Sequence, residues 1–312
     1  MAGAALAAGA APAFAAAADA LRLVRSGVAH DMLFDLAFDG PRGIAVGSYG
    51  SVLLSDDGGA AWRPADVPGA GRALLGTAIS GGRCLAVGQG GSILVADDCR
   101  RWRAADSGSG ERLMAVGLNA HGLAYAVGAF GTILRSADGG HTWQAVAVDW
   151  SAKSPSGAEP HLYAVHVAED GTVTLAGEFG LILRSRDGAD WRVAHAGEQS
   201  LFGLSIAGGT AHAVGQNGTV LASDDGGETW RPLASGSSAI LTGVWSDGKG
   251  RVVVTGLNAV LQSGDGGRSW RRVDAGAHAQ ATHMAVAAGQ SADGGQRVLM
   301  VGSAAAVIEL LR

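Results

Sequence analysis

This 312-residue chain contains few cysteines, few aromatic residues and little charge. Two cysteines are too few for a disulfide framework, and they lack the paired spacing of a zinc site. The net charge of −5 leaves no basic footprint for nucleic acid. After residue 20 there is no apolar run long enough to span a bilayer, which takes about 18 residues or more. A hydrophobic content of 47% nevertheless excludes a disordered chain.

The N-terminus has a composition of its own. The first basic residue is Arg22, and the preceding stretch is rich in alanine, with Ala13 and Ala15 or Ala16 and Ala18 as small residues for cleavage. This pattern is typical of the apolar region and cleavage zone of a secretory signal, although the positive segment is missing. We therefore expect residues 1–20 to be a signal peptide, with an uncleaved anchor or a cytosolic tail as alternatives.

Tryptophan is the over-represented aromatic residue, with 8 Trp against 3 Tyr and 6 Phe. Six of them recur at intervals of about 40 residues, and a glycine that ends a small apolar pair recurs in step with them. These marker glycines are Gly47, Gly88, Gly128, Gly177, Gly215, Gly256 and Gly302. Each unit contains short alternating apolar runs separated by Gly and Asp turns, which predicts four antiparallel strands. Seven such units predict an all-β fold, a seven-bladed β-propeller of four-stranded antiparallel blades.

The last unit lacks a fourth strand of its own, because the chain ends directly after the run 307–312. Residues 21–27 match the outer-strand segment 230–236 in an arginine, an apolar position and a final Ser-Gly. We therefore predict that the N-terminal strand completes the last blade, which would remove the exposed sheet edges of an open ring. Residues 21–312 would then form a single propeller domain.

A turn motif of the form SADGGHTW (136–143) recurs in six units, with degenerate copies at 96–102 and 185–191. The Asp is expected to accept hydrogen bonds from the turn backbone, Gly to take a positive φ, and Trp to pack against the sheet. Six copies at the repeat spacing indicate architecture rather than catalytic acids. The predicted structural residues are Asp57, Trp62, Asp98, Trp102, Asp138, Trp143, Asp187, Trp191, Asp225, Trp230, Asp265 and Trp270.

Both cysteines belong to one unit. Cys84 lies at the start of a second strand, and Cys99 replaces a Gly of the degenerate turn motif. A disulfide is possible if the two Cα atoms lie within about 7 Å, and two free thiols are the alternative.

The turn motifs resemble the Asp box, Ser/Thr-x-Asp-x-Gly-x-Thr-Trp. Together with Gly-rich stretches such as 215–221, they resemble the photosystem II stability/assembly factor family, a BNR/Asp-box group of seven-bladed propellers, over residues 21–312. The resemblance implies a non-catalytic, exported assembly, stability or scaffolding factor for a membrane protein complex. It further implies a basic patch and a protein partner such as a membrane-complex subunit, with membrane contact only through that partner. We expect a monomer without cofactor or metal, located in the periplasm or in the thylakoid lumen of a photosynthetic host.

The turns between second and third strands, with the connections between blades, form the face opposite the Asp boxes. Loops on a rigid scaffold are common binding sites. The candidate partner-binding residues on this face are Tyr49, Phe130, Trp150, Glu178, Phe179, Gln216, Asn217 and Asn258. Trp150 lies in the longest connection between blades. Alternatively, the ring of turns reflects turn preference and coverage of the channel, and Trp150 folds back onto its own blade.

Two other function classes remain as alternatives. A sialidase-like glycoside hydrolase needs an arginine cluster, a Tyr nucleophile with a Glu partner, and a further acid. Of the three tyrosines, Tyr125 and Tyr163 fall within predicted strands, and Tyr49 has no adjacent Glu. A ligand-binding receptor propeller akin to the sortilin group is the second alternative, without the disulfide-rich companion domains of those receptors. We expect no catalytic residue.

Overall fold

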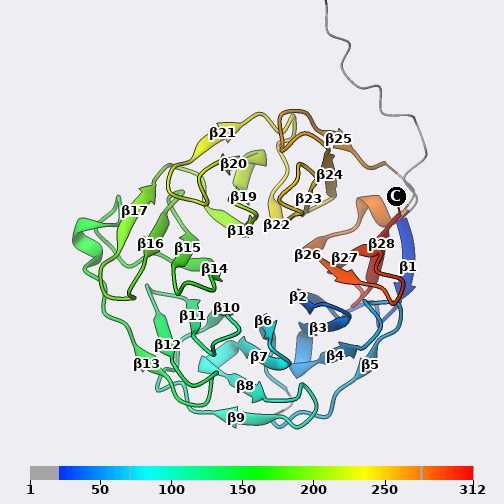
Figure 1. The fold of residues 1–312 in the computed structure, drawn as a ribbon, viewed down its shortest axis with the longest axis horizontal. Helices are drawn as coiled ribbons and strands as arrows, with labels where there is room; N and C mark the ends of the chain where they lie inside the picture. Colours follow the sequence, from blue (N-terminus) through cyan, green and yellow to red (C-terminus); the bar gives the residue numbers. More distant parts are fainter. Residues whose placement is uncertain (1–20, 70, 275–276, 312) are drawn as a thin grey trace, which may run out of the picture.

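The computed structural model describes residues 21–69, 71–274 and 277–311, so the predicted signal peptide lies outside the described residues. The described chain forms seven four-stranded antiparallel sheets arranged as blades around a central channel (Figure 1). This confirms the predicted seven-bladed propeller. Within the described ranges, no helix has the length and apolar character needed to cross a membrane.

Six blades are built from consecutive strands. Blades 1 and 2 comprise β2 (Leu33–Asp39), β3 (Arg42–Gly47), β4 (Val52–Ser55), β5 (Arg63–Pro64), β6 (Leu74–Ser80), β7 (Arg83–Gly88), β8 (Ile93–Ala96) and β9 (Arg103–Ala105). Blades 3 and 4 comprise β10 (Leu113–Leu118), β11 (Ala124–Gly128), β12 (Ile133–Ser136), β13 (Gln144–Ala145), β14 (Leu162–Val167), β15 (Val173–Gly177), β16 (Ile182–Ser185) and β17 (Arg192–His195). Blades 5 and 6 comprise β18 (Leu201–Ala207), β19 (Thr210–Gly215), β20 (Val220–Ser223), β21 (Arg231–Leu233), β22 (Leu241–Ser246), β23 (Val252–Gly256), β24 (Ala259–Ser263) and β25 (Arg271–Arg272).

Blade 7 joins the two ends of the chain. It comprises β26 (His283–Gln290), β27 (Gln296–Gly302), β28 (Val307–Leu310) and the N-terminal β1 (Leu21–Arg25). The remaining elements are short 3-10 helices: η1 (Ser48–Gly50), η2 (Gln89–Gly91), η3 (Trp150–Ala152), η4 (Gln216–Gly218) and η5 (Ala277–Gln280).

The core lies between the blades. Second strands such as β3, β7 and β11 are buried on both faces, because each sheet is covered by a neighbouring blade on either side. This explains their near-continuous apolar sequences, since a strand buried on both faces has no solvent side for polar residues. The outermost strands, such as β5 and β25, are short and exposed.

Every innermost strand has a register shift at the same place. In blade 1 it falls between Leu33 and Asp35, and the other six blades repeat it at the equivalent position. A β-bulge adds one residue to a strand and redirects a side chain. The repeated bulge therefore gives each blade one side chain with an altered direction near the channel.

The Asp boxes form the predicted hydrogen bonds. In blade 5, Ser223 Oγ donates to Asp225 Oδ1 at 2.6 Å, and the backbone N–H of Thr229 donates to the same oxygen at 2.9 Å. Trp230 Nε1 donates to the carbonyl of Gly227 at 3.1 Å. The hydrogen bonds from Ser223 and then Thr229 lower the pKa of Asp225 well below its usual range. The box carboxylates are thus held in turns as acceptors.

The boxes also touch the preceding blade. At Gly140 φ is +93°, and a Cβ there would lie 2.3 Å from the side chain of Leu85 on β7. Glycine is required at this position by both the backbone conformation and the close approach. Similarly, His212 of blade 5 contacts the carbonyl of Gly266 in the box of blade 6 at 3.2 Å. Box turns therefore contribute to packing between blades.

The ring closes through β1, which pairs antiparallel with β28. Arg22 of β1 and Arg297 of β27 both donate to the buried carboxylate of Glu309 on β28. Burial raises the pKa of Glu309, but the hydrogen bonds from Arg297 and Arg22 lower it more, and the net shift is downward. This arrangement confirms the predicted N-terminal closure.

The two cysteines form a disulfide that joins β7 to the degenerate box of the same blade, with a Cα–Cα distance of 5.0 Å. The bond resolves the alternative between a disulfide and free thiols. It spans 15 residues, and a crosslink over a loop of that size stabilises a fold by about 3 kcal/mol. A disulfide is consistent with an oxidising compartment.

A chain that begins at Val28 lacks β1 and leaves β28 as an unpaired edge. We expect its Tm to fall by about 10 °C or more, which corresponds to a loss of about 6 kcal/mol in a chain of this size. The measurement is thermal unfolding followed by circular dichroism. A chain that begins at Leu21 is the matched control and should melt as the full chain does. Equal Tm values for the two truncated chains would disprove closure by β1.

The double variant Cys84→Ser/Cys99→Ser should lose about 2–4 kcal/mol of unfolding free energy without reductant, because the crosslink is gone. Urea unfolding measures this difference. Reductant should lower the unfolding free energy of the native chain to that of the variant and should not change the unfolding free energy of the variant. A native chain that is insensitive to reductant would contradict the expectation.

Candidate functional site

The propeller has two different faces. We call the face with the turns between second and third strands the turn face, and the opposite one, which carries the Asp boxes, the box face. In all seven turns the second residue after the marker glycine has φ between 50° and 62°. These residues are Tyr49, Gly90, Phe130, Phe179, Asn217, Asn258 and Ala304. The turn geometry is therefore constant, while the side chain varies.

Three of these left-handed positions carry aromatic residues. Gly and Asn adopt this conformation readily, whereas other L-residues pay about 1–2 kcal/mol. Tyr49 is 67% exposed and Phe130 is 59% exposed, so burial of the ring does little to offset the strain. Phe179 is half-buried. Strained backbone that packing does not explain is often found at functional sites.

The amide and carboxylate candidates are engaged by their own loops. Gln216 Oε1 accepts from the backbone N–H of Ser200 at 3.1 Å, and Asn217 Nδ2 donates to Gln199 at 2.8 Å. Glu178 Oε2 accepts from the backbone N–H of His161 at 2.8 Å. Asn258 is exposed, and its backbone carbonyl, not its side-chain amide, accepts from Arg272 at 2.7 Å. The structure brings these residues to the turn face, but the contacts of their polar groups are internal.

Trp150 does not belong to the exposed surface. It begins η3 and is only 7% exposed, within a core cluster that includes Val127, Ile133 and Leu162. The indole also lies against Gly131, in the turn that carries Phe130. Trp150 therefore supports the turn face from beneath, and the expectation that it meets a partner directly is corrected.

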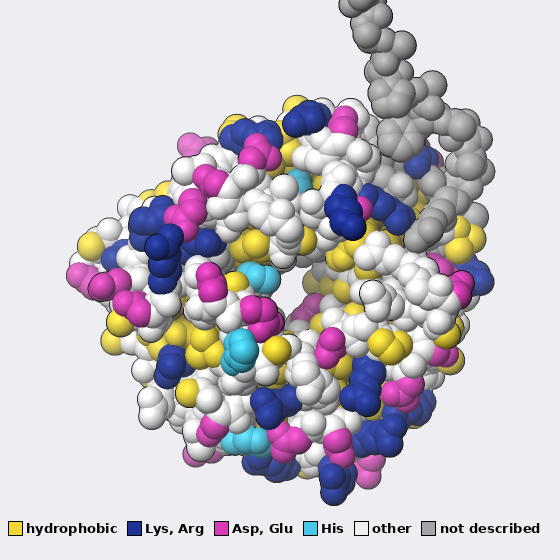
Figure 2. Space-filling model, viewed as in Figure 1, with side chains coloured by type: hydrophobic (Ala, Val, Ile, Leu, Met, Phe, Trp, Pro, Cys, Tyr) yellow, Lys and Arg dark blue, Asp and Glu magenta, His cyan; other side chains and the backbone are white. Residues whose placement is uncertain are grey.

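The repeated bulge creates a feature that sequence reasoning missed. The second residue of each innermost strand is half-buried and lines a central cavity of about 480 Å³. These seven residues, which we call the collar, are Phe34, Leu75, Met114, Tyr163, Phe202, Thr242 and Met284. Innermost strands begin opposite the marker glycines, as in the pairing of Leu33 with Gly47, so the collar lies at the turn-face end of the channel. Figure 2 shows the central opening. The missed signal was a recurring Leu–large–small pattern at the start of these strands.

Aromatic rings connect the exposed turns to the collar. Phe130 contacts His161 with ring centroids 4.9 Å apart, and Tyr163 contacts Phe202 at 5.0 Å. His161 and Tyr163 lie 6.4 Å apart, which completes the series. Burial and the neighbouring Glu178 carboxylate raise the pKa of Tyr163 to about 12. Its hydroxyl therefore stays protonated at neutral pH.

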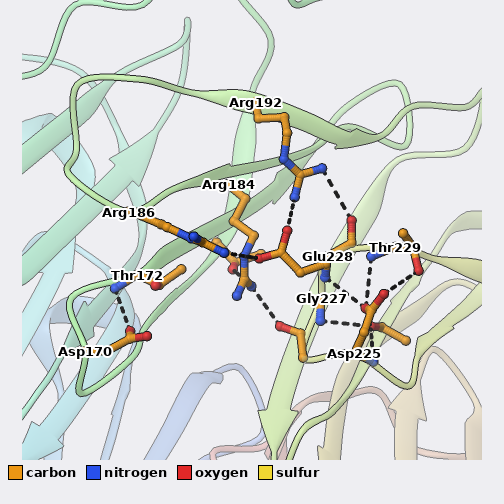
Figure 3. A network of polar contacts seen from close by, with 12 residues as sticks. Asp170, Thr172, Arg184, Arg186, Arg192, Asp225, Gly227, Glu228 and Thr229 are labelled. Atoms are coloured by element: carbon orange, nitrogen blue, oxygen red, sulfur yellow. Dashed lines mark hydrogen bonds and ion pairs between the residues drawn. The ribbon is translucent and has the colours of Figure 1, made fainter.

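Blade 4 also carries an arginine cluster, shown in Figure 3. Arg184 Nε lies 3.0 Å from Glu228, Arg186 lies 3.4 Å from it, and Arg192 pairs with its second oxygen. Arg184 also donates to the carbonyl of Gly226 at 2.7 Å, so the cluster lies at the box face, at the boundary with blade 5. Three cations share one carboxylate, and Figure 2 shows basic side chains gathered over the region of β16 and β17. Sequence reasoning did not place this basic group, because Glu228 comes from the next blade.

The arginine cluster does not converge with Tyr163, and Tyr125, whose hydroxyl lies against Gly188 in the box of blade 4, is buried. Tyr163 and Glu178 lie at the turn face of blade 4, and the three arginines lie at its other end. A sialidase-like centre would need these groups around one substrate.

The fold and this face define a seven-bladed propeller with aromatic residues on the turn face around a central cavity. No family model and no curated protein matches the chain. Among solved structures it is similar to YCF48 bound to D1 peptide, with 17% identity, a TM-score of 0.71, and coverage of 96% of this chain and 97% of that one. YCF48 from Cyanidioschyzon merolae is 18% identical, with a TM-score of 0.67 and coverage of 93% of this chain and 98% of that one. The WD40 propeller domain of Doa1 is 13% identical, with a TM-score of 0.72 and coverage of 94% of this chain and 97% of that one. At these identities the likeness shows the fold alone.

Arg184→Ala should cost about 1–3 kcal/mol, because this side chain is only 15% exposed and donates to Glu228, Thr174 and Gly226. Arg186→Ala is the matched control: its side chain is 81% exposed, and we expect a cost below about 0.5 kcal/mol. Urea unfolding of both variants measures the difference. Equal costs would show that the cluster does not bind blade 4 to blade 5.

Proposed function

We propose that this protein is a non-catalytic, protein-binding propeller, exported to the periplasm or the thylakoid lumen, which acts as an assembly, stability or scaffolding factor for a membrane protein complex. The observation that carries the proposal is the pair of exposed aromatic residues, Tyr49 and Phe130, held in left-handed turns. Aromatic residues are enriched among the side chains that dominate binding energy at protein interfaces. A role in binding, rather than in folding, would explain why aromatic residues occupy these two strained backbone positions.

Three further observations support this proposal. The turn face surrounds a central cavity, so that exposed rings and a concave surface lie together. The disulfide agrees with export to an oxidising compartment. The similar YCF48 structure contains a D1 peptide, and by analogy we propose a polypeptide ligand for this chain as well.

A non-catalytic role agrees with the state of the acidic and phenolic groups. The box carboxylates accept hydrogen bonds from their own turns, as Asp225 does from Ser223 and Thr229. Tyr163, whose pKa is about 12, is a poor nucleophile at neutral pH. The arginine cluster is separated from it by the length of the blade. These features give no support to glycoside hydrolysis.

The double variant Tyr49→Asn/Phe130→Asn tests the proposal. Asn occupies the same position in two other blades, so the exchange should relieve strain and stabilise the fold by about 1 kcal/mol. Loss of the two rings should reduce recovery of a membrane-complex subunit from the native host about tenfold. The measurements are urea unfolding, and affinity capture followed by quantitative mass spectrometry.

The control is Val193→Ala, which removes an exposed apolar side chain from the outer strand β17. It should capture the same subunits as the native chain does. If the double variant also captures them in full, the turn-face rings do not form the binding site.

A further inference from the structure

The third residue of each innermost strand is small in six of the seven blades. It is Gly or Ala at Gly76, Ala115, Ala164, Gly203, Gly243 and Ala285. Neighbouring innermost strands approach closely here, since a Cβ at Gly76 would lie 2.7 Å from the Cα of Ala115. Blade 1 carries Asp35 at this position, facing the adjacent blade 2. One carboxylate therefore occupies a position that carries Gly or Ala in the other six blades.

Asp35 lines the central cavity and has acceptor capacity to spare. Its Oδ1 accepts from the backbone N–H of Leu36 and its Oδ2 from that of Thr77, both at 2.8 Å. An ionised carboxylate offers about four acceptor sites. Within the described part of the chain, no Lys or Arg lines the cavity and no ion pair to Asp35 is formed. Asp35 is half-buried, and a charge withdrawn from water is normally paired, because desolvation is costly without a counter-ion.

The remaining cavity wall suits the stem of a long basic side chain. Phe34, Tyr163 and Phe202 contribute aromatic surface, and Met114 and Met284 contribute thioethers. Lys and Arg bury their methylene groups along apolar surfaces, and aromatic faces attract cations. The cavity volume of about 480 Å³ lies within the usual range of ligand pockets.

We propose that the central cavity binds a Lys or Arg side chain, flanked by apolar residues, from the protein partner, with Asp35 as its counter-ion. This inference rests on the proposed protein-binding function and names the part of the partner that enters the channel. The cation occupies the free acceptor sites of Asp35, and the apolar flanks contact the collar. Asp35 thereby acts as a specificity residue as well as a hydrogen-bond link between blades 1 and 2.

The first test uses two pairs of blocked peptides. One pair is Ac-Leu-Ala-Arg-Ala-Leu-NH₂ and its citrulline counterpart, which keeps the shape of the Arg side chain without its charge, and the other has Lys and norleucine at the same position. The native chain should bind the Arg peptide about tenfold more tightly than the citrulline peptide, and the Lys peptide more tightly than its norleucine counterpart. Binding is followed by NMR titration. Equal affinities within each pair, or no binding of either cationic peptide, would overturn the inference.

The second test separates recognition from structure. Asp35→Asn keeps one acceptor for a backbone N–H but removes the charge, and it should abolish the preference for Arg over citrulline. Asp39→Asn is the control, because it removes an exposed carboxylate from the far end of the same strand. This control should retain the preference. If the Asp35→Asn variant has a lower Tm but still prefers the Arg peptide over the citrulline peptide, the role of Asp35 is structural only.

The preference should also depend on pH. Burial raises the pKa of Asp35 to about 6, against the lowering effect of the N–H groups of Thr77 and Leu36. The cation should therefore bind best above about pH 6, and the preference should be lost as acidification protonates the carboxyl. Tyr163, the other titratable group of the lining, stays neutral. The residues that β3, β6 and β26 place beside Asp35 or in the cavity are uncharged: Val46, Leu75, Thr77, Met284, Ala285 and Val286. A preference that is constant from about pH 8 to about pH 5 contradicts the role of Asp35.

These outcomes are distinguishable from failure of the proposed function. If partner capture depends on Tyr49 and Phe130 but the cavity shows no preference for a charged peptide, the proposed function is supported and the cation site is disproved. Conversely, a charge preference that Asp35→Asn abolishes, without any capture by the native chain, would support the site and count against the proposed partner class.

Discussion

A four-stranded blade of this protein cannot bury its own apolar faces, and every other feature depends on that constraint. The second strands are apolar on both faces, so each sheet needs a neighbour on either side. Only a closed ring provides a neighbour for every blade, which is why β1 crosses to β28. The Glu309 carboxylate, shared by Arg22 and Arg297, holds this junction in a way that leaves no buried charge unpaired.

The ring assigns different tasks to its two faces. On the box face, the carboxylates accept hydrogen bonds within their own turns, as Asp225 does, and the glycines permit close contact with the preceding blade, as Gly140 does. On the turn face the backbone is equally regular, but its second turn residue can differ from blade to blade. This freedom permits Tyr49 and Phe130 at positions where Asn or Gly would adopt the left-handed backbone conformation with less strain. The turn face is therefore the candidate binding surface.

Prediction from the sequence succeeded where the signal was periodic. Blade number, closure by residues 21–27 and the structural role of the Asp boxes all followed from residues that recur every 40 or so positions. It left the disulfide open, because the distance between Cys84 and Cys99 depends on how the box turn folds against β7. It missed the collar, because a bulge reverses the side-chain alternation that a regular strand would have. The arginine cluster was missed because its shared carboxylate, Glu228, belongs to another blade.

The sequence by itself thus determined the architecture, since each repeat carries the turn chemistry and apolar alternation of one blade. The tertiary structure alone decided which side chains meet. It buried Trp150 beneath the turn face, left Tyr49 exposed, and placed Asp35 in the wall of the central cavity. The physical reason is that these contacts join residues from different blades or different strands. Their approach is set by how seven sheets pack around one axis, and no local pattern in the chain encodes that distance.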